Sequence, residues 1–124
     1  RYLDSFKNSP NLFVSVRMRS DDKAVGTMTA YMAPQHQTVD VGIMIGRRSV
    51  WGLGVGQDAW NTLLGWLGAQ PEIRKITAGT MCCNQPMVRL MENSGMVLEA
   101  TQPKQELLDG IPQDLMYYGK FCDN

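Results

Sequence analysis

Three closely spaced glycines, Gly52, Gly54 and Gly56, stand where phosphate chemistry would require them. They follow an alternating apolar run and precede a helical pattern that opens at Gln57. Glycine permits the tight turns that expose backbone amides, and the N-terminus of a helix attracts an anionic group. The segment 38–61 therefore predicts a phosphate cradle between a strand and a helix.

The strand ahead of these glycines, residues 38–46, has two unlike faces. Side chains alternate along a strand, so its branched aliphatic residues share one face while Asp40, Gly42 and Met44 share the other. A glycine within a strand often marks the close approach of a ligand or of another backbone. We therefore expect a ligand to lie along the face that carries Asp40.

Two common phosphate-binding motifs fit the glycines poorly. The nucleoside triphosphate loop ends in Gly-Lys-Ser/Thr, but Gly56 is followed by Gln57 and Asp58. The dinucleotide fingerprint is formally met by Gly54, Gly56 and Ala59, yet Arg-Arg-Ser interrupts the path from the strand to the first glycine. A chain of 124 residues is also too short for both halves of a dinucleotide fold. A dinucleotide-binding fragment is the weakest of the alternatives kept.

Composition narrows the class of protein. The 12 basic and 12 acidic residues cancel, which disfavours nucleic acid as the main partner. No apolar run reaches the length of a membrane span and no leader opens the chain, so we expect a cytoplasmic protein with one domain over residues 1–124. The single histidine, His36, makes a metal site improbable. The three cysteines are expected to be reduced thiols: Cys82, Cys83 and Cys122.

Hydrophobic periodicity predicts the elements that must position these residues. A helix follows the glycines and ends near Gly68, and a second one is capped by Asn84 and stops at Gly95. The prolines and the glycine between residues 101 and 114 suggest a connection there. Strands are predicted at 12–19, 24–33, 38–46, 74–81, 96–101 and 114–121. This order indicates a mixed α/β or α+β sheet.

The loop and several later residues together resemble one family. Residues 51–56 have the spacing Gln/Arg-x-x-Gly-x-Gly/Ala that opens the coenzyme A pyrophosphate loop of the GNAT N-acetyltransferases, with Trp51 at the first position. The chain is most similar to the ribosomal-protein-alanine acetyltransferase branch, and the resemblance covers about residues 12–121. The further matching residues are Asp40, Gly42, Asp58, Ala59, Asn84, Glu92, Gly95, Met96, Asp109, Gly110, Asp114, Tyr117 and Tyr118.

The resemblance implies a mostly antiparallel central sheet with helices on both faces, and acetyl-coenzyme A as the co-substrate. Its pyrophosphate would meet the backbone amides around residues 53–56, and its pantetheine arm would lie along residues 43–45, where the third and fourth strands splay apart. The side chain of Asn84 would bond this arm, besides capping its helix. The implied cofactor-binding residues are Ile43, Met44, Ile45, Trp51, Gly52, Leu53, Gly54, Val55, Gly56 and Asn84. No metal is implied.

Acetyl transfer requires a base for the amine, an oxyanion donor and a proton for the leaving thiolate. We expect Asp40 to be the base, acting through a water, and the amide of Met44 to stabilise the oxyanion. Many members of the superfamily place a tyrosine acid where this chain has Met91. Ser94 is the first remaining candidate for the acid. Cys83, Tyr31 and solvent are the others.

The leading hypothesis is therefore an N-acetyltransferase that acts on a primary amine by direct attack in a ternary complex. The acceptor would be a protein N-terminus or a small amine. A non-catalytic acyl-coenzyme A binding module is the alternative, because Met91 cannot donate a proton. The family usually has a strand and two helices ahead of Leu12. Either the chain is a piece of a longer protein, or a partner such as a second copy in a homodimer covers the sheet edge.

Overall fold

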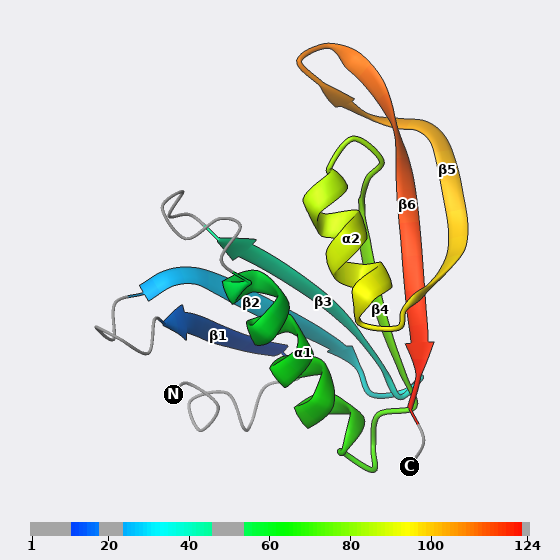
Figure 1. Cartoon of the computed structure of the whole chain (residues 1–124). Coiled ribbons are helices and arrows are strands. Elements are labelled where there is room, and N and C mark those ends of the chain that lie inside the picture. The colour runs from blue at the N-terminus through cyan, green and yellow to red at the C-terminus, as the bar shows by residue number, and fades with distance from the viewer. Residues whose placement is uncertain (1–10, 18–23, 46–53, 123–124) are drawn as a thin grey trace.

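The computed structural model describes residues 11–17, 24–45 and 54–122. Within these ranges the chain forms one six-stranded sheet with two helices (Figure 1). The strands lie in the order β1-β2-β3-β4-β6-β5. Their bounds are Asn11–Arg17 for β1, Ala24–Ala33 for β2, Thr38–Ile45 for β3, Lys75–Met81 for β4, Val97–Leu108 for β5 and Ile111–Phe121 for β6.

The sheet is mixed and mostly antiparallel, which confirms the prediction. Among the described strands β3 and β4 pair in parallel, and all other neighbours pair antiparallel. The helix α1 (Val55–Gly68) connects these two strands, and α2 (Gln85–Asn93) connects β4 to β5. Both connections step across the sheet in the same direction, so the right-handed crossover rule places both helices on one face. Figure 1 shows them in front of the sheet. The family resemblance implies helices on both faces, and the described helices occupy one of them.

The core fills the space between this face and the two helices. Alternate residues of the central strands point into it, among them Val39, Val41, Ile76 and Ala78, each at most 2% exposed. The helices contribute Trp60, Leu67 and Met91, which are completely buried. Because side chains alternate along each strand, the opposite face carries the polar set predicted for Asp40, Gly42 and Met44. We call this second surface the open face.

Most predicted elements are confirmed to within two residues, but the last two strands are longer than expected. β5 and β6 extend to the two-residue turn Asp109–Gly110, where both residues have positive φ. Asp-Gly is a strong signal for a tight hairpin turn, and here it decides the structure although Pro103 and Pro112 lie on either side. The register of β5 shifts between Gln102 and Glu106, a break that accommodates Pro103.

Candidate active site

A gap opens between the two parallel strands. β3 and β4 pair only from Thr38–Lys75 to Asp40–Thr77, although β3 continues to Ile45 and β4 to Met81. Figure 1 shows the strands diverging beyond this point towards their C-terminal ends. The facing edges of β3 and β4 beyond the last pair are therefore free to bond an extended ligand. This splay is where the pantetheine arm was expected.

The direction of each peptide group along β3 follows from its pairing. The Thr77 hydroxyl oxygen lies 3.4 Å from the Val39 carbonyl oxygen, so the backbone N–H and C=O of Val39 face β4. The β2–β3 register runs without a shift from Thr38 to Ile45. The backbone N–H and C=O of one strand residue point to the same edge, and this edge alternates from residue to residue. Those of Ile43 and Ile45 therefore face the gap, whereas those of Met44 face β2.

This geometry corrects the expectation for Met44. Its amide lies on the edge that pairs with β2, opposite Thr27, and its side chain is 70% exposed on the open face. The amides of Ile43 and Ile45 are the ones turned towards the gap. The face on which a strand residue carries its side chain does not indicate which strand edge its amide serves, because the two directions are perpendicular.

The N-terminus of α1 lies at the end of the sheet where β3 ends, because the helix runs back from there to the start of β4. Gly54 is its N-cap with φ of 80°, a left-handed conformation that favours glycine. No side chain among the described residues caps this end. Val55 and Gly56 form the first turn, so the first amides of the helix are available to an anion. The other predicted loop residues, Trp51, Gly52 and Leu53, lie outside the described residues.

The N-terminus of α2 lies on the other side of the gap, where β4 ends. Asn84 is the N-cap, and its Oδ1 accepts from the Met87 amide at 3.3 Å. Its capping role is thus confirmed, while its Nδ2 makes no hydrogen bond with a described residue. That nitrogen remains a donor for a ligand carbonyl. Cys83 precedes it and is exposed.

Asp40 lies at the vertex of the gap, in the last residue pair before the strands part. Its Oδ1 accepts from the Thr77 hydroxyl at 2.9 Å. Partial burial raises the pKa of the Asp40 carboxyl above its ordinary value, and the hydrogen bond from Thr77 opposes that shift. A raised pKa makes a carboxylate a stronger base, which suits the role expected for Asp40.

Thr77 was not singled out by the sequence. It alternates with Ile76 and Ala78, so its place on the open face was readable from the strand pattern. Its position beside Asp40 was not, because that depends on the parallel register of two strands 37 residues apart.

Ser94 is held away from the gap, at the C-terminal end of α2, whereas Asn84 is at the N-terminal end. Its hydroxyl accepts from the Trp60 indole N–H at 3.0 Å and donates to the Met91 carbonyl at 2.8 Å. The proton that a general acid would supply is therefore engaged within the helix end. The geometry gives Ser94 the role of joining α1 to α2.

This role predicts the effect of Ser94→Ala. The substitution leaves the buried Trp60 N–H without a partner, which costs about 1–3 kcal/mol of the free energy of unfolding. Urea denaturation measures this loss, and kcat for acetyl transfer should stay within about twofold of wild type. Thr62→Ala is a matched control, because it removes an exposed hydroxyl that bonds the Asp58 carbonyl. Unchanged stability together with a strongly reduced kcat would return Ser94 to the list of acids.

The remaining family-like residues near α2 have structural explanations. The Tyr118 hydroxyl donates to Glu92 Oε2 at 3.0 Å, which ties β6 to α2. Burial, with the hydrogen bond and charge of Glu92, raises the pKa of Tyr118. Gly95 ends the helix with φ of 88°, and the Met96 amide bonds the Met91 carbonyl at 3.1 Å.

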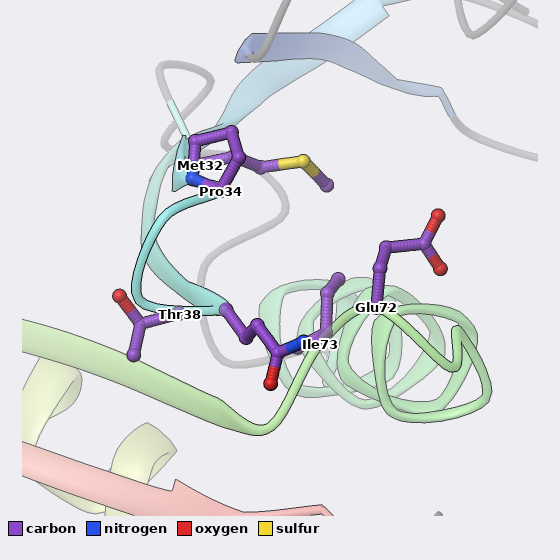
Figure 2. A pocket seen from close by; sticks show the side chains of 6 residues that line it. Met32, Pro34, Thr38, Glu72 and Ile73 are labelled. Atoms are coloured by element: carbon purple, nitrogen blue, oxygen red, sulfur yellow. The ribbon is translucent and has the colours of Figure 1, made fainter.

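A separate small cavity of about 150 Å³ lies at the closed end of the gap (Figure 2). The β2–β3 turn and the α1–β4 connection form its walls, and the turn is fixed by a bond from Arg74 Nη2 to the His36 carbonyl at 3.1 Å. The volume is below the range of small-molecule sites, so we do not assign the coenzyme to it. The lining residues are Met32, Pro34, Gln37, Thr38, Glu72 and Ile73.

Other candidate chemistries find no support in the described part of the chain. No group of three or more His, Cys, Asp or Glu side chains among those residues is arranged to hold a metal ion. The thiols of Cys82, Cys83 and Cys122 are not joined in disulfides with one another. None of the described helices has the length and apolar character needed to cross a membrane.

Solved structures of acetyltransferases share this fold. A variant of the spermidine N-acetyltransferase of Vibrio cholerae superposes with a TM-score of 0.82 at 18% identity, over 97% of this chain and 70% of that one. The microcin C7 self-immunity acetyltransferase, in complex with acetyl-CoA and AMP, gives 0.80 at 22% identity over 93% and 63%. The ribosomal L7/L12 α-N-protein acetyltransferase RimL, in complex with coenzyme A, gives 0.75 at 18% identity over 82% and 58%.

The chain thus spans between about three fifths and seven tenths of the length of these structures. Identities this low establish the fold alone. No curated protein matches the sequence significantly. A sequence model of the acetyltransferase (GNAT) domain matches residues 1–97, which is most of the chain. Together with the splayed parallel strands, this match shows that the chain belongs to the GNAT family of acetyltransferase domains.

Proposed function

We propose that the chain transfers an acetyl group from acetyl-CoA to a primary amine by direct attack in a ternary complex. The observation that carries this proposal is the gap between β3 and β4, which has a helix N-terminus on either side and Asp40 at its vertex. A carboxylate, free backbone groups and two helix dipoles thus converge on one opening. An odd number of cysteines with no disulfide among them suits a reducing compartment, and we propose a cytoplasmic location.

The described residues fit the parts of coenzyme A. The uncapped amides of α1 and its dipole would hold the pyrophosphate, and Gly54 supplies the backbone conformation that begins the helix. The strand edge at Ile43 and Ile45 would bond the amide groups of the pantetheine arm, as an added strand does. The free Nδ2 of Asn84 would donate to the same arm from the other side.

The catalytic steps follow from these positions. Asp40, through a water, takes a proton from the ammonium form of the acceptor. The free amine then attacks the thioester carbonyl, and an amide turned into the gap, that of Ile43 or Ile45, stabilises the oxyanion. As the carbonyl forms again, the carbon–sulfur bond breaks, the thiolate leaves and the nitrogen releases its second proton to solvent. A thiol has a pKa of about 8.5, so solvent can return its proton near neutral pH without a dedicated acid residue.

The test measures thiol release by the full chain with acetyl-CoA and a panel of primary amines, alongside acetyl-CoA binding by isothermal titration. Amine-dependent release supports the proposed enzyme. Binding without release with any amine would favour the non-catalytic acyl-coenzyme A module. NAD binding in the absence of acetyl-CoA binding would overturn both.

Gly54→Ala tests the phosphate end of the site. An L-residue in the left-handed region costs about 1–2 kcal/mol, so the substitution should disturb the first turn of α1 and raise the KM for acetyl-CoA about five- to thirtyfold. Gly65→Ala is the matched control within the same helix, where an added Cβ meets nothing within 4 Å. It should stabilise the protein by about 0.5–1 kcal/mol and leave this KM unchanged. Equal KM values for the two variants would remove Gly54 from the site.

A further inference from the structure

The open face beside Asp40 combines one carboxylate with exposed apolar side chains. Asp40, Gly42 and Met44 share this face of β3, and Tyr31 and Phe13 share it on β2 and β1. Phe13 is 44% exposed, Tyr31 47% and Met44 70%. We call the surface formed by Phe13, Tyr31, Asp40 and Met44 around Gly42 the open-face shelf.

Tyr31 and Asp40 are direct partners across the β2–β3 ladder. Directly opposed residues on one face have Cβ atoms about 4.5–5.5 Å apart, so the tyrosine and the aspartate start from neighbouring positions on the open face. The ring of Phe13 packs against Tyr31 edge to face, with centroids 6.1 Å apart and an interplanar angle of 89°. This contact holds the tyrosine ring in place and adds a second aromatic surface.

Gly42 has no side chain, so the surface at the centre of the open-face shelf is recessed. Its partner on β2 is Thr29, whose Oγ1 lies 3.2 Å from the position a Cβ would take at Gly42. Any larger residue at position 42 would therefore rise between Asp40 and Met44 and displace the threonine. The glycine thus keeps an apolar approach to the carboxylate open along β3.

The neighbouring charges restrict what this surface attracts. Lys75 lies on the same face of β4, two residues before Thr77, and its Nζ pairs with Glu99 Oε1 at 2.8 Å. Lys75 also lies over the Phe121 ring, 4.9 Å from the centroid. Lys75 and Glu99 therefore neutralise each other, and among the described residues at the vertex Asp40 is the carboxylate that attracts a cation. The four shelf residues include no second carboxylate, so a second cationic group on the same ligand would lie against apolar side chains without a partner there.

We infer that the open-face shelf binds the acceptor, and that the acceptor is a primary monoamine with an apolar substituent. This inference rests on the proposed function. The ammonium group lies between the Asp40 carboxylate and the face of Tyr31, where charge and cation–π attraction act together. The apolar substituent lies over Gly42 towards Met44 and Phe13. From this position the nitrogen loses its proton to Asp40 through water and attacks the thioester held in the gap.

The experiment compares phenethylamine with putrescine as acceptors. Phenethylamine should give at least about a tenfold higher kcat/KM, a difference of about 1.4 kcal/mol. Tyr31→Leu should raise the KM for phenethylamine about fivefold, since a cation–π contact at an exposed site is worth about 0.5–1 kcal/mol and ring contact is lost as well. Tyr31→Phe keeps the ring and should stay within about twofold. The KM for acetyl-CoA should not change in either variant.

Phe121→Leu serves as the control, because it removes another exposed aromatic ring of the open face that contacts Lys75 rather than Asp40. It should leave the KM for phenethylamine unaltered. A preference for putrescine, or an unchanged amine KM in Tyr31→Leu, would overturn the shelf while leaving the acetyltransferase proposal intact. A large loss of kcat in Tyr31→Phe would also overturn it, by making the hydroxyl an acid.

An NMR titration with phenethylammonium tests the shelf without turnover. Shifts at Phe13 and Met44 that disappear in Tyr31→Leu support the binding site even if no thiol is released. Absence of such shifts at millimolar amine contradicts the shelf, whereas absence of thiol release with every amine contradicts the proposed function.

Discussion

Asp40→Asn is expected to lower kcat/KM for acetyl transfer about 10²- to 10⁴-fold at neutral pH, the usual contribution of a general base. The substituted amide is nearly the same size and can still accept from the Thr77 hydroxyl, so the geometry at the vertex is kept. Steady-state rates of thiol release at saturating acetyl-CoA measure the loss. A variant with unchanged rates at every pH would show that another group accepts the proton.

The fold itself should tolerate this substitution. Burial raises the pKa of Asp40, so the folded state binds its proton more tightly than the unfolded chain does. The carboxylate therefore lowers the free energy of unfolding as the pH rises through the folded-state pKa. At neutral pH Asp40→Asn should be at least as stable as wild type in urea. Loss of activity with retained stability separates a catalytic role from a structural one.

Thr77, whose hydroxyl bonds Asp40, provides a control for the pH dependence of activity. Activity should rise with pH as Asp40 loses its proton, and the Thr77 hydrogen bond lowers the pKa at which this occurs. Thr77→Val removes that bond and should move the rising limb of kcat/KM to higher pH. Thr77→Ser keeps a hydroxyl and should leave the limb in place.

The local parts of this site were readable from the sequence. The cap at Asn84 and the stop at Gly95 depend on interactions within five residues, and both were predicted. The alternation that puts Asp40 and Gly42 on one face depends only on the period of a strand. Each of these features is fixed by the backbone geometry of one element, so no knowledge of its neighbours was needed.

The parts that depend on contacts between elements were not readable. The Asp40–Thr77 bond requires the parallel register of β3 and β4, and the end of that register creates the gap. The role of Ser94 appears only once α1 and α2 pack on the same face and bring Trp60 to its hydroxyl. The hairpin turn at Asp109–Gly110 was missed for a different reason, since its local signal competed with two prolines. The predictions for Trp51, Gly52 and Leu53 remain predictions.

Trp60→Ala is expected to cause the largest loss of stability of any single change discussed for this chain. The indole is completely buried between the sheet and the two helices, and truncation of such a residue costs about 3–5 kcal/mol of the free energy of unfolding. The change also removes the donor that bonds Ser94 at 3.0 Å. Urea denaturation followed by circular dichroism measures the loss, because the reporter does not depend on tryptophan fluorescence.

Trp66→Ala separates this effect from the loss of any tryptophan in α1. Trp66 is 40% exposed on the same helix, so its truncation should cost about 1 kcal/mol or less. Similar losses for the two variants would mean that Trp60 does not anchor the core. If Trp60→Ala does not fold, Trp60→Phe keeps most of the ring and loses the N–H, and its stability should fall between the two.

Trp60 should also affect the binding of acetyl-CoA, because it links the two helices that begin on either side of the gap. α1 and α2 begin on opposite sides of the gap, and the bond from Trp60 to Ser94 links the first half of α1 to the C-terminal end of α2. Gln57 adds two further bonds between the helices, one to the Leu90 carbonyl and one from Asn93. Loss of this bond leaves fewer contacts between the helices, so the donors for the pyrophosphate and for the pantetheine arm keep a less fixed separation. Trp60→Phe should therefore raise the KM for acetyl-CoA, whereas Trp66→Ala should not. A binding defect in Trp60→Phe, measured by isothermal titration at a temperature where the variant is fully folded, would show that the helix contact sets the width of the site as well as stabilising the fold.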